Sequence, residues 1–120
     1  MADINTVLND FAVGARQIFG SIDVEVILFG SYSRGDYDAS SDVDVAILAD
    51  IPREQERNYT NDVVSLISKI DSEYEYSFFI SPIIISKSFF EQWYETIPFY
   101  RTLKAEGVKI DVPNRSPVAV

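Results

Sequence analysis

Two short apolar runs with a polar connection between them are the feature that most restricts how this chain can fold. Val24–Phe29 and Val43–Leu48 are rich in β-branched residues, and the connection begins with Gly30-Ser31 and ends in Asp42-Val43-Asp44. Runs of this length, bounded by glycine, serine and aspartate, are typical of strands. The pattern therefore predicts two strands joined by a polar turn.

The rest of the chain alternates helical and extended patterns. Apolar residues recur at helical spacing from Ile4 to Phe19, with Asp3 as a possible cap and Gly20 as the end. The elements predicted after the second strand are, in order, a helix from Pro52 to about Ile70, a strand from Tyr74 to Ile85 that is interrupted or edged at Pro82, a helix capped by Ser86, a short helix from Pro98 to Gly107 and a strand over Val108–Val112. This order predicts a small α/β (α+β) domain over residues 1–112, with helices packed on a three- or four-stranded sheet, and a C-terminal tail over 113–120.

Composition narrows the chemistry. The 120 residues include no His and no Cys, which excludes Ser-His-Asp catalysis, thiol nucleophiles and zinc sites built on imidazole or thiolate. Lys and Arg number 10 against 19 Asp and Glu, and the resulting net charge of −9 argues against direct nucleic-acid binding. The longest apolar stretch, Phe78–Ile85, is too short to span a bilayer, and no export signal opens the chain, so we expect no membrane association and a cytoplasmic location.

The turn at Gly30-Ser31 has the character of an anion site. Glycine lets a backbone turn sharply and approach a ligand closely, and Ser31 could cap a helical turn whose free amides point outward. Arg34, one turn later, could add a charge-assisted hydrogen bond to the same anion. We expect a phosphate to bind here.

Asp42 and Asp44 form a possible metal site. Because strand side chains alternate, both carboxylates face the same way, roughly 6–7 Å apart, while Val43 and Val45 face the core. With no His or Cys available, these oxygen ligands indicate Mg²⁺ or Mn²⁺. Each feature alone fits an ordinary solvated turn, but the phosphate turn and the carboxylate pair together favour metal-assisted phosphoryl or nucleotidyl transfer.

The run Gly30-Ser31-x-x-Arg34-Gly35-x₅-Ser41-Asp42-x-Asp44 resembles the signature of the polymerase-β-like nucleotidyltransferase superfamily, and most closely its minimal nucleotidyltransferases. The resemblance implies that Gly30 and Ser31 bind the triphosphate of ATP or another NTP, with Arg34 and Ser41 supporting that pocket. It also implies that Asp42 and Asp44 hold two Mg²⁺ ions while a hydroxyl of a protein or small molecule attacks the α-phosphate. Many such proteins are antitoxins of HEPN-domain toxins, so the resemblance implies a basic, helical toxin as the partner.

The chain departs from this family at a third carboxylate on the later strand. Aligning Ile80-Ser81-Pro82 with that strand places Ser77 at the position of the third acid. Serine is neither a charged metal ligand nor a base near neutral pH. Glu75 and Glu73 would share the face of Ser77 in a continuous strand, and could either reach the site or face solvent.

Two hypotheses follow. The first is a Mg²⁺-dependent nucleotidyltransferase acting as the antitoxin of a toxin–antitoxin pair, and the second is a nucleotide-binding module that neutralises a partner by contact alone.

Six aromatic residues near the C-terminus could be core or a partner surface, with core packing favoured: Phe89, Phe90, Trp93, Tyr94, Phe99 and Tyr100.

Overall fold

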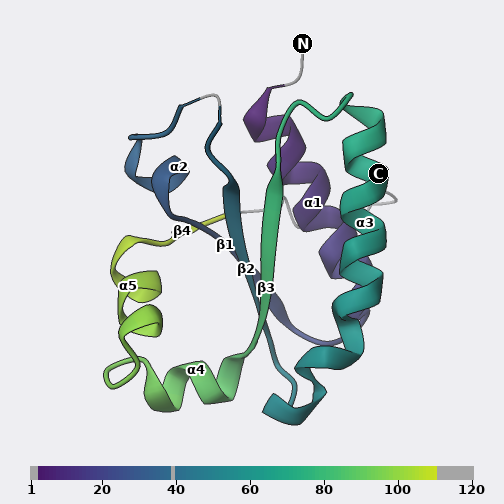
Figure 1. Ribbon diagram of the computed structural model, residues 1–120. Coiled ribbons are helices and arrows are strands. Elements are labelled where there is room, and N and C mark those ends of the chain that lie inside the picture. Colours follow the sequence, from purple (N-terminus) through teal and green to yellow (C-terminus); the bar gives the residue numbers. More distant parts are fainter. Residues whose placement is uncertain (1–2, 39, 111–120) are drawn as a thin grey trace, which may run out of the picture.

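A four-stranded mixed sheet lies at the centre of the computed structural model, which describes residues 3–38 and 40–110 (Figure 1). Within that part of the chain the strands are β1 (Val24–Phe29), β2 (Val43–Ala49), β3 (Ile80–Ser86) and β4 (Val108–Lys109), in the spatial order β3-β2-β1-β4. Strand β1 is antiparallel to β2 and β4, and β2 is parallel to β3. Consequently the end of β1 and the beginnings of β2 and β3 meet at one end of the sheet.

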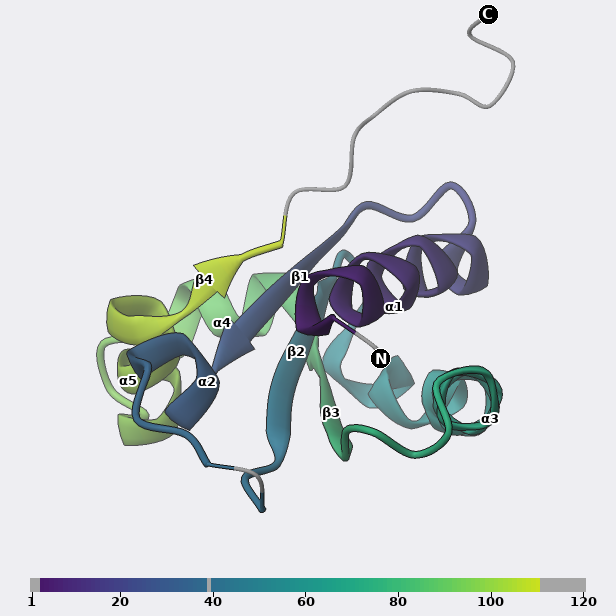
Figure 2. The ribbon, with the colours of Figure 1, turned by 90° about the horizontal axis from the view of Figure 1, so that it is seen from above.

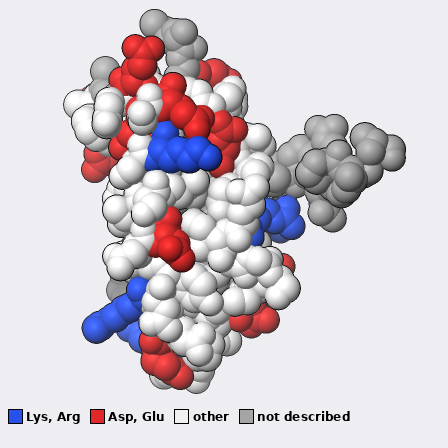
Figure 3. Space-filling model, turned by 90° about the vertical axis from the view of Figure 1, so that its right-hand side faces the viewer, with Lys and Arg blue, Asp and Glu red and all other residues white. Residues whose placement is uncertain are grey.

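Helices pack on the sheet, as the sequence predicts, and they cover both of its faces (Figures 1 and 2). One face carries α1 (Ile4–Phe19) and α3 (Thr60–Glu73), and the other carries α4 (Lys87–Trp93) and α5 (Pro98–Glu106). The connecting elements are the one-turn helix α2 (Ser31–Arg34) and the 3-10 segment η1 (Arg53–Tyr59). On the side that carries α3, charged side chains lie mostly towards the two ends, and the surface between them is largely uncharged (Figure 3).

Strand β2 is central and apolar on both faces. Val43, Val45 and Ile47 are fully buried in the core beneath α1 and α3, as the alternation of side chains requires. Ala46 and Leu48 point the other way into a second core cluster with residues of α4 and α5. Burial on both sides explains why this run reads as almost continuously apolar.

Several boundaries differ from those predicted. The helix expected from Pro52 to Ile70 is a 3-10 segment followed by an α-helix that continues to Glu73. Asp3 occupies the N-cap position of α1 with extended backbone, but its side chain makes no capping hydrogen bond; its main-chain oxygen accepts the first helical bond, from the Val7 amide at 3.1 Å. By contrast, the cap at Ser86 is confirmed, since its hydroxyl accepts from the Phe89 amide at 3.4 Å.

The predicted strand from Tyr74 to Ile85 is wrong in its first half. The Tyr74 amide donates to the Ile70 carbonyl at 2.9 Å, so the chain is still helical there, and the Tyr74 hydroxyl donates to the Asp10 carboxylate on α1. Glu75 and Tyr76 then adopt left-handed backbone, with φ of 55° and 56°. The strand begins only at Ile80, and Pro82 lies in an edge strand, as expected from its missing amide hydrogen.

The C-terminal aromatic residues divide between core and surface. Phe90 and Tyr100 are buried in the second cluster, which confirms the favoured alternative for these two, whereas Trp93 and Phe99 remain 38% and 39% exposed.

The final strand ends at Lys109, and the predicted tail 113–120 lies outside the described residues. In the part of the chain that is described, no helix has the length and apolar character needed to cross a membrane.

Candidate functional site

Gly30, the residue directly after β1, lies against the carboxylate of Asp44. Its φ of 77° and ψ of −155° lie in a region that only glycine adopts readily. Its neighbour Phe29 pairs in register with Asp44, and a Cβ on Gly30 would overlap Asp44 Oδ2. The main chain of the turn and a carboxylate of β2 are therefore in direct contact, because position 30 has no side chain.

Helix α2 follows this turn at once. Ser31 is its first helical residue, so the expectation that Ser31 caps the turn is wrong; the Ser33 hydroxyl donates to the Gly30 carbonyl at 3.0 Å. The Arg34 amide also donates to the Gly30 carbonyl, at 3.2 Å. The amides of Ser31 and Tyr32 stand at the start of the turn, where a helix offers no internal acceptor, and so are free to bind an anion.

Asp42 and Asp44 flank the fully buried Val43, so their carboxylates lie on the opposite side from the α1–α3 core. Asp42 is exposed just before β2, and Asp44 is half-buried within it. Burial, followed by repulsion from Asp42, raises the pKa of Asp44 above its ordinary value, and the nearby Arg34 only partly offsets this. A bound cation would relieve this repulsion.

The loop before Asp42 is ordered by its own side chains. The Asp38 carboxylate accepts from the Ser40 amide at 2.8 Å and from the Ser40 hydroxyl at 2.7 Å, and these bonds lower the pKa of Asp38. The Asp38 amide donates to the Ser41 hydroxyl at 2.9 Å. Ser41 is thus placed one residue before the carboxylate pair, where it fixes the loop.

Arg34 lies at the rim of the site. Its Nε donates to Asp36 at 3.3 Å and its Nη1 to Glu106, at the end of α5, at 3.4 Å. Both ion pairs are exposed, so they hold the guanidinium only weakly and leave it able to move towards a phosphate. These two acids raise the pKa of Arg34, which stays charged.

The register of β2 and β3 identifies which residues stand beside the carboxylate pair. Asp44 pairs with Ser81, and the Val43 amide donates to the Phe79 carbonyl at 2.7 Å, which places Phe79 beside Asp42. The assignment of Ser77 to this position is therefore wrong. Glu75, the suggested substitute, lies in the left-handed turn and shares no strand face with the site. Pro82 indicated an edge strand, but no local pattern indicated the register in which that strand pairs with β2.

The donor set suits a hard divalent cation. Among residues 3–38 and 40–110, no group of three or more Asp, Glu, His or Cys side chains is arranged to hold a metal. The two carboxylates can nevertheless hold Mg²⁺ when a nucleotide supplies phosphate oxygens, since this ion is commonly bound by one or two carboxylates together with substrate phosphates. Asp42 and Asp44 are the residues that would bind it.

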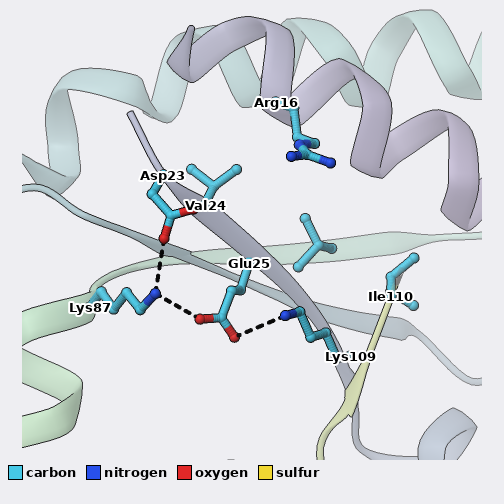
Figure 4. A pocket seen from close by; sticks show the side chains of 8 residues that line it. Arg16, Asp23, Val24, Glu25, Lys87, Lys109 and Ile110 are labelled. Atoms are coloured by element: carbon cyan, nitrogen blue, oxygen red, sulfur yellow. Dashed lines mark hydrogen bonds and ion pairs between the residues drawn. The ribbon is translucent and has the colours of Figure 1, made fainter. Parts of the chain in front are cut away.

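A hollow at the opposite end of β1 from this site has a different character (Figure 4). Lys87 bridges Asp23 at 2.9 Å and Glu25 at 2.8 Å, and these two acids raise its pKa. Lys109 adds a longer ion pair with Glu25, at 3.9 Å. The acids of this hollow are already paired with lysines, so we interpret it as a structural ion-pair network that ties α4 to β1.

Comparisons with known proteins relate this chain to a family and to solved structures. Residues 9–111 match the family described as "Nucleotidyltransferase domain". A relative from Methanocaldococcus jannaschii, named "Putative protein adenylyltransferase MJ0141", is 44% identical over 89 residues, which is 72% of each chain.

Solved structures with the same fold come from toxin–antitoxin complexes. One, a toxin–antitoxin crystal structure with AMP-PNP, has a TM-score of 0.53 at 17% identity and covers 88% of this chain and 73% of that one. Another, of a MntA-HpeT toxin–antitoxin mutant, has a TM-score of 0.50 at 14% identity and covers 94% of this chain and 75% of that one. At these identities the likeness establishes the mixed-sheet fold.

Proposed function

This chain belongs to the nucleotidyltransferase domain family, and from that premise we propose that it transfers the nucleoside monophosphate of ATP or another NTP to a hydroxyl group of a partner protein. The observation that carries the proposal is the contact between Gly30 and Asp44. It brings the free amides of α2, which suit a phosphate, against the carboxylate pair, which suits the cation that the phosphate carries.

Each group has a separate task in this proposal. The amides of Ser31 and Tyr32 hold the terminal phosphates, and Arg34 neutralises their charge. Asp42 and Asp44 would hold Mg²⁺, which would supply charge neutralisation on the phosphate oxygens. The acceptor hydroxyl then attacks the α-phosphorus in line, its proton is released to solvent water, and the bond to the pyrophosphate leaving group breaks. Ser41 keeps the loop in place so that Asp42 stays beside Asp44.

A protein acceptor is favoured by the relative named as a protein adenylyltransferase and by the toxin–antitoxin complexes that share the fold. We propose a HEPN-like toxin as the partner, which makes this chain an antitoxin. Its net charge of −9 is complementary to a basic protein.

The test uses ATP labelled on the α-phosphate, Mg²⁺ and the protein encoded beside this one. We expect label on that protein, no label when the γ-phosphate carries it, and loss of transfer in Asp42→Asn. Asp50→Asn is the matched control, since Asp50 is exposed and lies just beyond the other end of β2. Equal labelling by Asp42→Asn and the native chain would reject the proposed chemistry.

A second candidate is a nucleotide-binding module that neutralises its partner by contact alone. The pairing that brings Phe79 beside Asp42 favours it, because this residue offers the carboxylate pair no side-chain oxygen. Partner binding that survives Asp42→Asn, with no label transferred, would support this alternative.

A further inference from the structure

We infer that Phe79 and Ile83 form an apolar docking site for the segment of the partner protein that carries the acceptor hydroxyl. The inference rests on the proposed function and deepens it, because it assigns the side of the site from which the acceptor enters. The partner chemistry that fits this docking site is a hydroxyl group flanked by an apolar side chain and by a basic one.

Phe79 and Ile83 lie on the face of the sheet that also carries Asp44. Ser81, which lies between them in the sequence, pairs with Asp44 in the parallel register of β2 and β3, and paired residues of neighbouring strands point to the same face. The buried Ile80 points the other way, into the core beneath α1 and α3. Because side chains alternate along an extended chain, residues 79 and 83 share the face of Ser81.

The core does not use either of these side chains. Phe79 is 65% exposed and Ile83 is 38% exposed. Neither packs against the core clusters that the described residues form, although their neighbours Phe78, Ile84 and Ile85 do. Single exposed apolar residues are ordinary, but two on one strand face beside a polar site are typical of an interaction surface.

The in-line geometry of the proposed reaction assigns this side of the site to the acceptor. The attacking oxygen, the phosphorus and the leaving oxygen lie roughly on one line, so the acceptor enters opposite the pyrophosphate. In the proposed function the pyrophosphate end lies at Ser31 and Tyr32, directly after β1, and the carboxylate pair belongs to β2. Strand β3 lies on the other side of β2 from β1 (Figure 1). The line from the leaving group across the carboxylates therefore ends over β3, at Phe79 and Ile83.

The charge near the docking site fits a basic partner segment. Residues 70–86, which lead into β3 and include it, contain no Lys or Arg. Glu75 is exposed in the turn that leads to Phe79, and the exposed Asp42 lies beside Phe79 in the register. A Lys or Arg near the acceptor hydroxyl is complementary to these acids, and such complementarity mainly sets the orientation and the rate of association.

The partner segment docks through side chains and does not extend the sheet. Strand β3 is an edge strand, and the Phe79 carbonyl faces β2, so the backbone groups of Ile80, Pro82 and Ile84 face the free edge. Pro82 has no amide hydrogen, which removes the middle donor that an added strand would need. The face that carries Phe79 and Ile83 is therefore better suited to the partner than the edge.

The experiment measures transfer of the α-phosphate label from Mg²⁺–ATP to the protein encoded beside this one, over a range of acceptor concentrations. Phe79→Ser and Ile83→Ser should each raise the KM for the acceptor about tenfold, as loss of a central interface contact commonly does. At saturating acceptor, kcat should change by less than about threefold, because the lost contact is made before and during the reaction alike. Phe79→Leu, which remains apolar, should keep the KM within about twofold of the native value.

Val64→Ser is the matched control. Val64 is 52% exposed on α3, which packs on the opposite face of the sheet, so its replacement should leave the KM for the acceptor unchanged. Thermal unfolding checks that each variant is folded. Calorimetry with a non-hydrolysable ATP analogue and no partner checks that nucleotide affinity is retained.

An unchanged KM in either folded serine variant, or a rise of the same size in Val64→Ser, would overturn the inference and leave the proposed function standing. A fall in kcat without a rise in KM would also overturn it, since the residues would then act on the reaction and not on docking. Absence of label transfer by the native chain would instead reject the proposed function, and this inference with it.

Discussion

The Cα of Gly30 lies directly against the carboxylate of Asp44, so closely that any side chain at position 30 would overlap it. The two residues are distant in sequence but adjacent in the antiparallel pair β1–β2, where Phe29 opposes Asp44. This contact joins the two parts of the proposed nucleotide site.

Gly30→Ala should therefore impair binding as well as stability. The new methyl group must displace the Asp44 carboxylate, and we expect the affinity for a Mg²⁺–ATP analogue to fall at least about tenfold, or ~1.4 kcal/mol. Isothermal titration calorimetry measures it. Gly20→Ala is the control, because Gly20 also has a positive φ of 61° but nothing within 4 Å of its Cβ position. Equal affinity in the two variants would contradict the role of the contact.

Asp44→Asn should stabilise the metal-free protein at neutral pH. Burial and Asp42 raise the pKa of Asp44 above 3.8, so its ionised form costs stability in the folded state. The stability that the protonated Asp44 carboxyl contributes is therefore fully present below the pKa of this group in the unfolded chain. It is lost as the pH rises through the raised pKa of the group in the folded protein.

Thermal unfolding in chelator-treated buffer tests this expectation. Asp44→Asn should have the higher Tm at pH 7, the difference should vanish as pH falls below 3.8, and Mg²⁺ with nucleotide should no longer raise the Tm of the variant. Asp50→Asn serves as the comparison at the other end of β2. A lower Tm for Asp44→Asn at neutral pH would show that the carboxylate is instead a net stabilising group.

Arg34→Gln should weaken nucleotide binding without destabilising the fold. Its ion pairs to Asp36 and Glu106 are exposed and contribute little to stability. Loss of a charge-assisted bond to phosphate should lower affinity about tenfold, ~1.4 kcal/mol. Fluorescence titration with a nucleotide analogue measures the change, and Arg57→Gln, on η1, is the matched control. A large fall in Tm with unchanged affinity would assign Arg34 a structural role.

Ser86→Ala should destabilise the fold and leave the site intact. The fully buried Ser86 hydroxyl donates to the Ile51 carbonyl at 2.6 Å and accepts from the Phe89 amide at the start of α4. Removing it leaves a buried carbonyl unpaired and a cap missing, at a cost of about 1–3 kcal/mol. Urea unfolding measures the loss. Ser68→Ala, at an exposed position of α3, should change stability by less than ~0.5 kcal/mol.

The elements that are indicated by a pattern of consecutive residues were predicted correctly. The bounds of α1 and β1 are confirmed, because helical periodicity and a β-branched run are properties of consecutive residues. The burial of Val43 likewise confirms that Asp42 and Asp44 both point away from the core, because the side chains of an extended chain alternate between its two faces.

The segment from Tyr74 to Phe79 could not be predicted in this way. Its β-favouring residues indicate a strand, but α3 continues to Glu73 and Tyr74 hydrogen bonds to Asp10 on α1. A contact between helices far apart in sequence thus overrides local preference, as tertiary structure commonly does.

The sequence by itself determined the family, the α/β architecture and the pairing of a glycine turn with Asp42 and Asp44. These depend on residue order over short distances. Only the tertiary structure decided that Gly30 contacts Asp44 and that Phe79, rather than Ser77, stands beside Asp42. Ser77 and Phe79 are two residues apart and would share one face of a continuous strand, so the alternation of side chains cannot distinguish them. The pairing of Ile80 with Val43 in the core fixes the register and so decides which of the two lies beside Asp42.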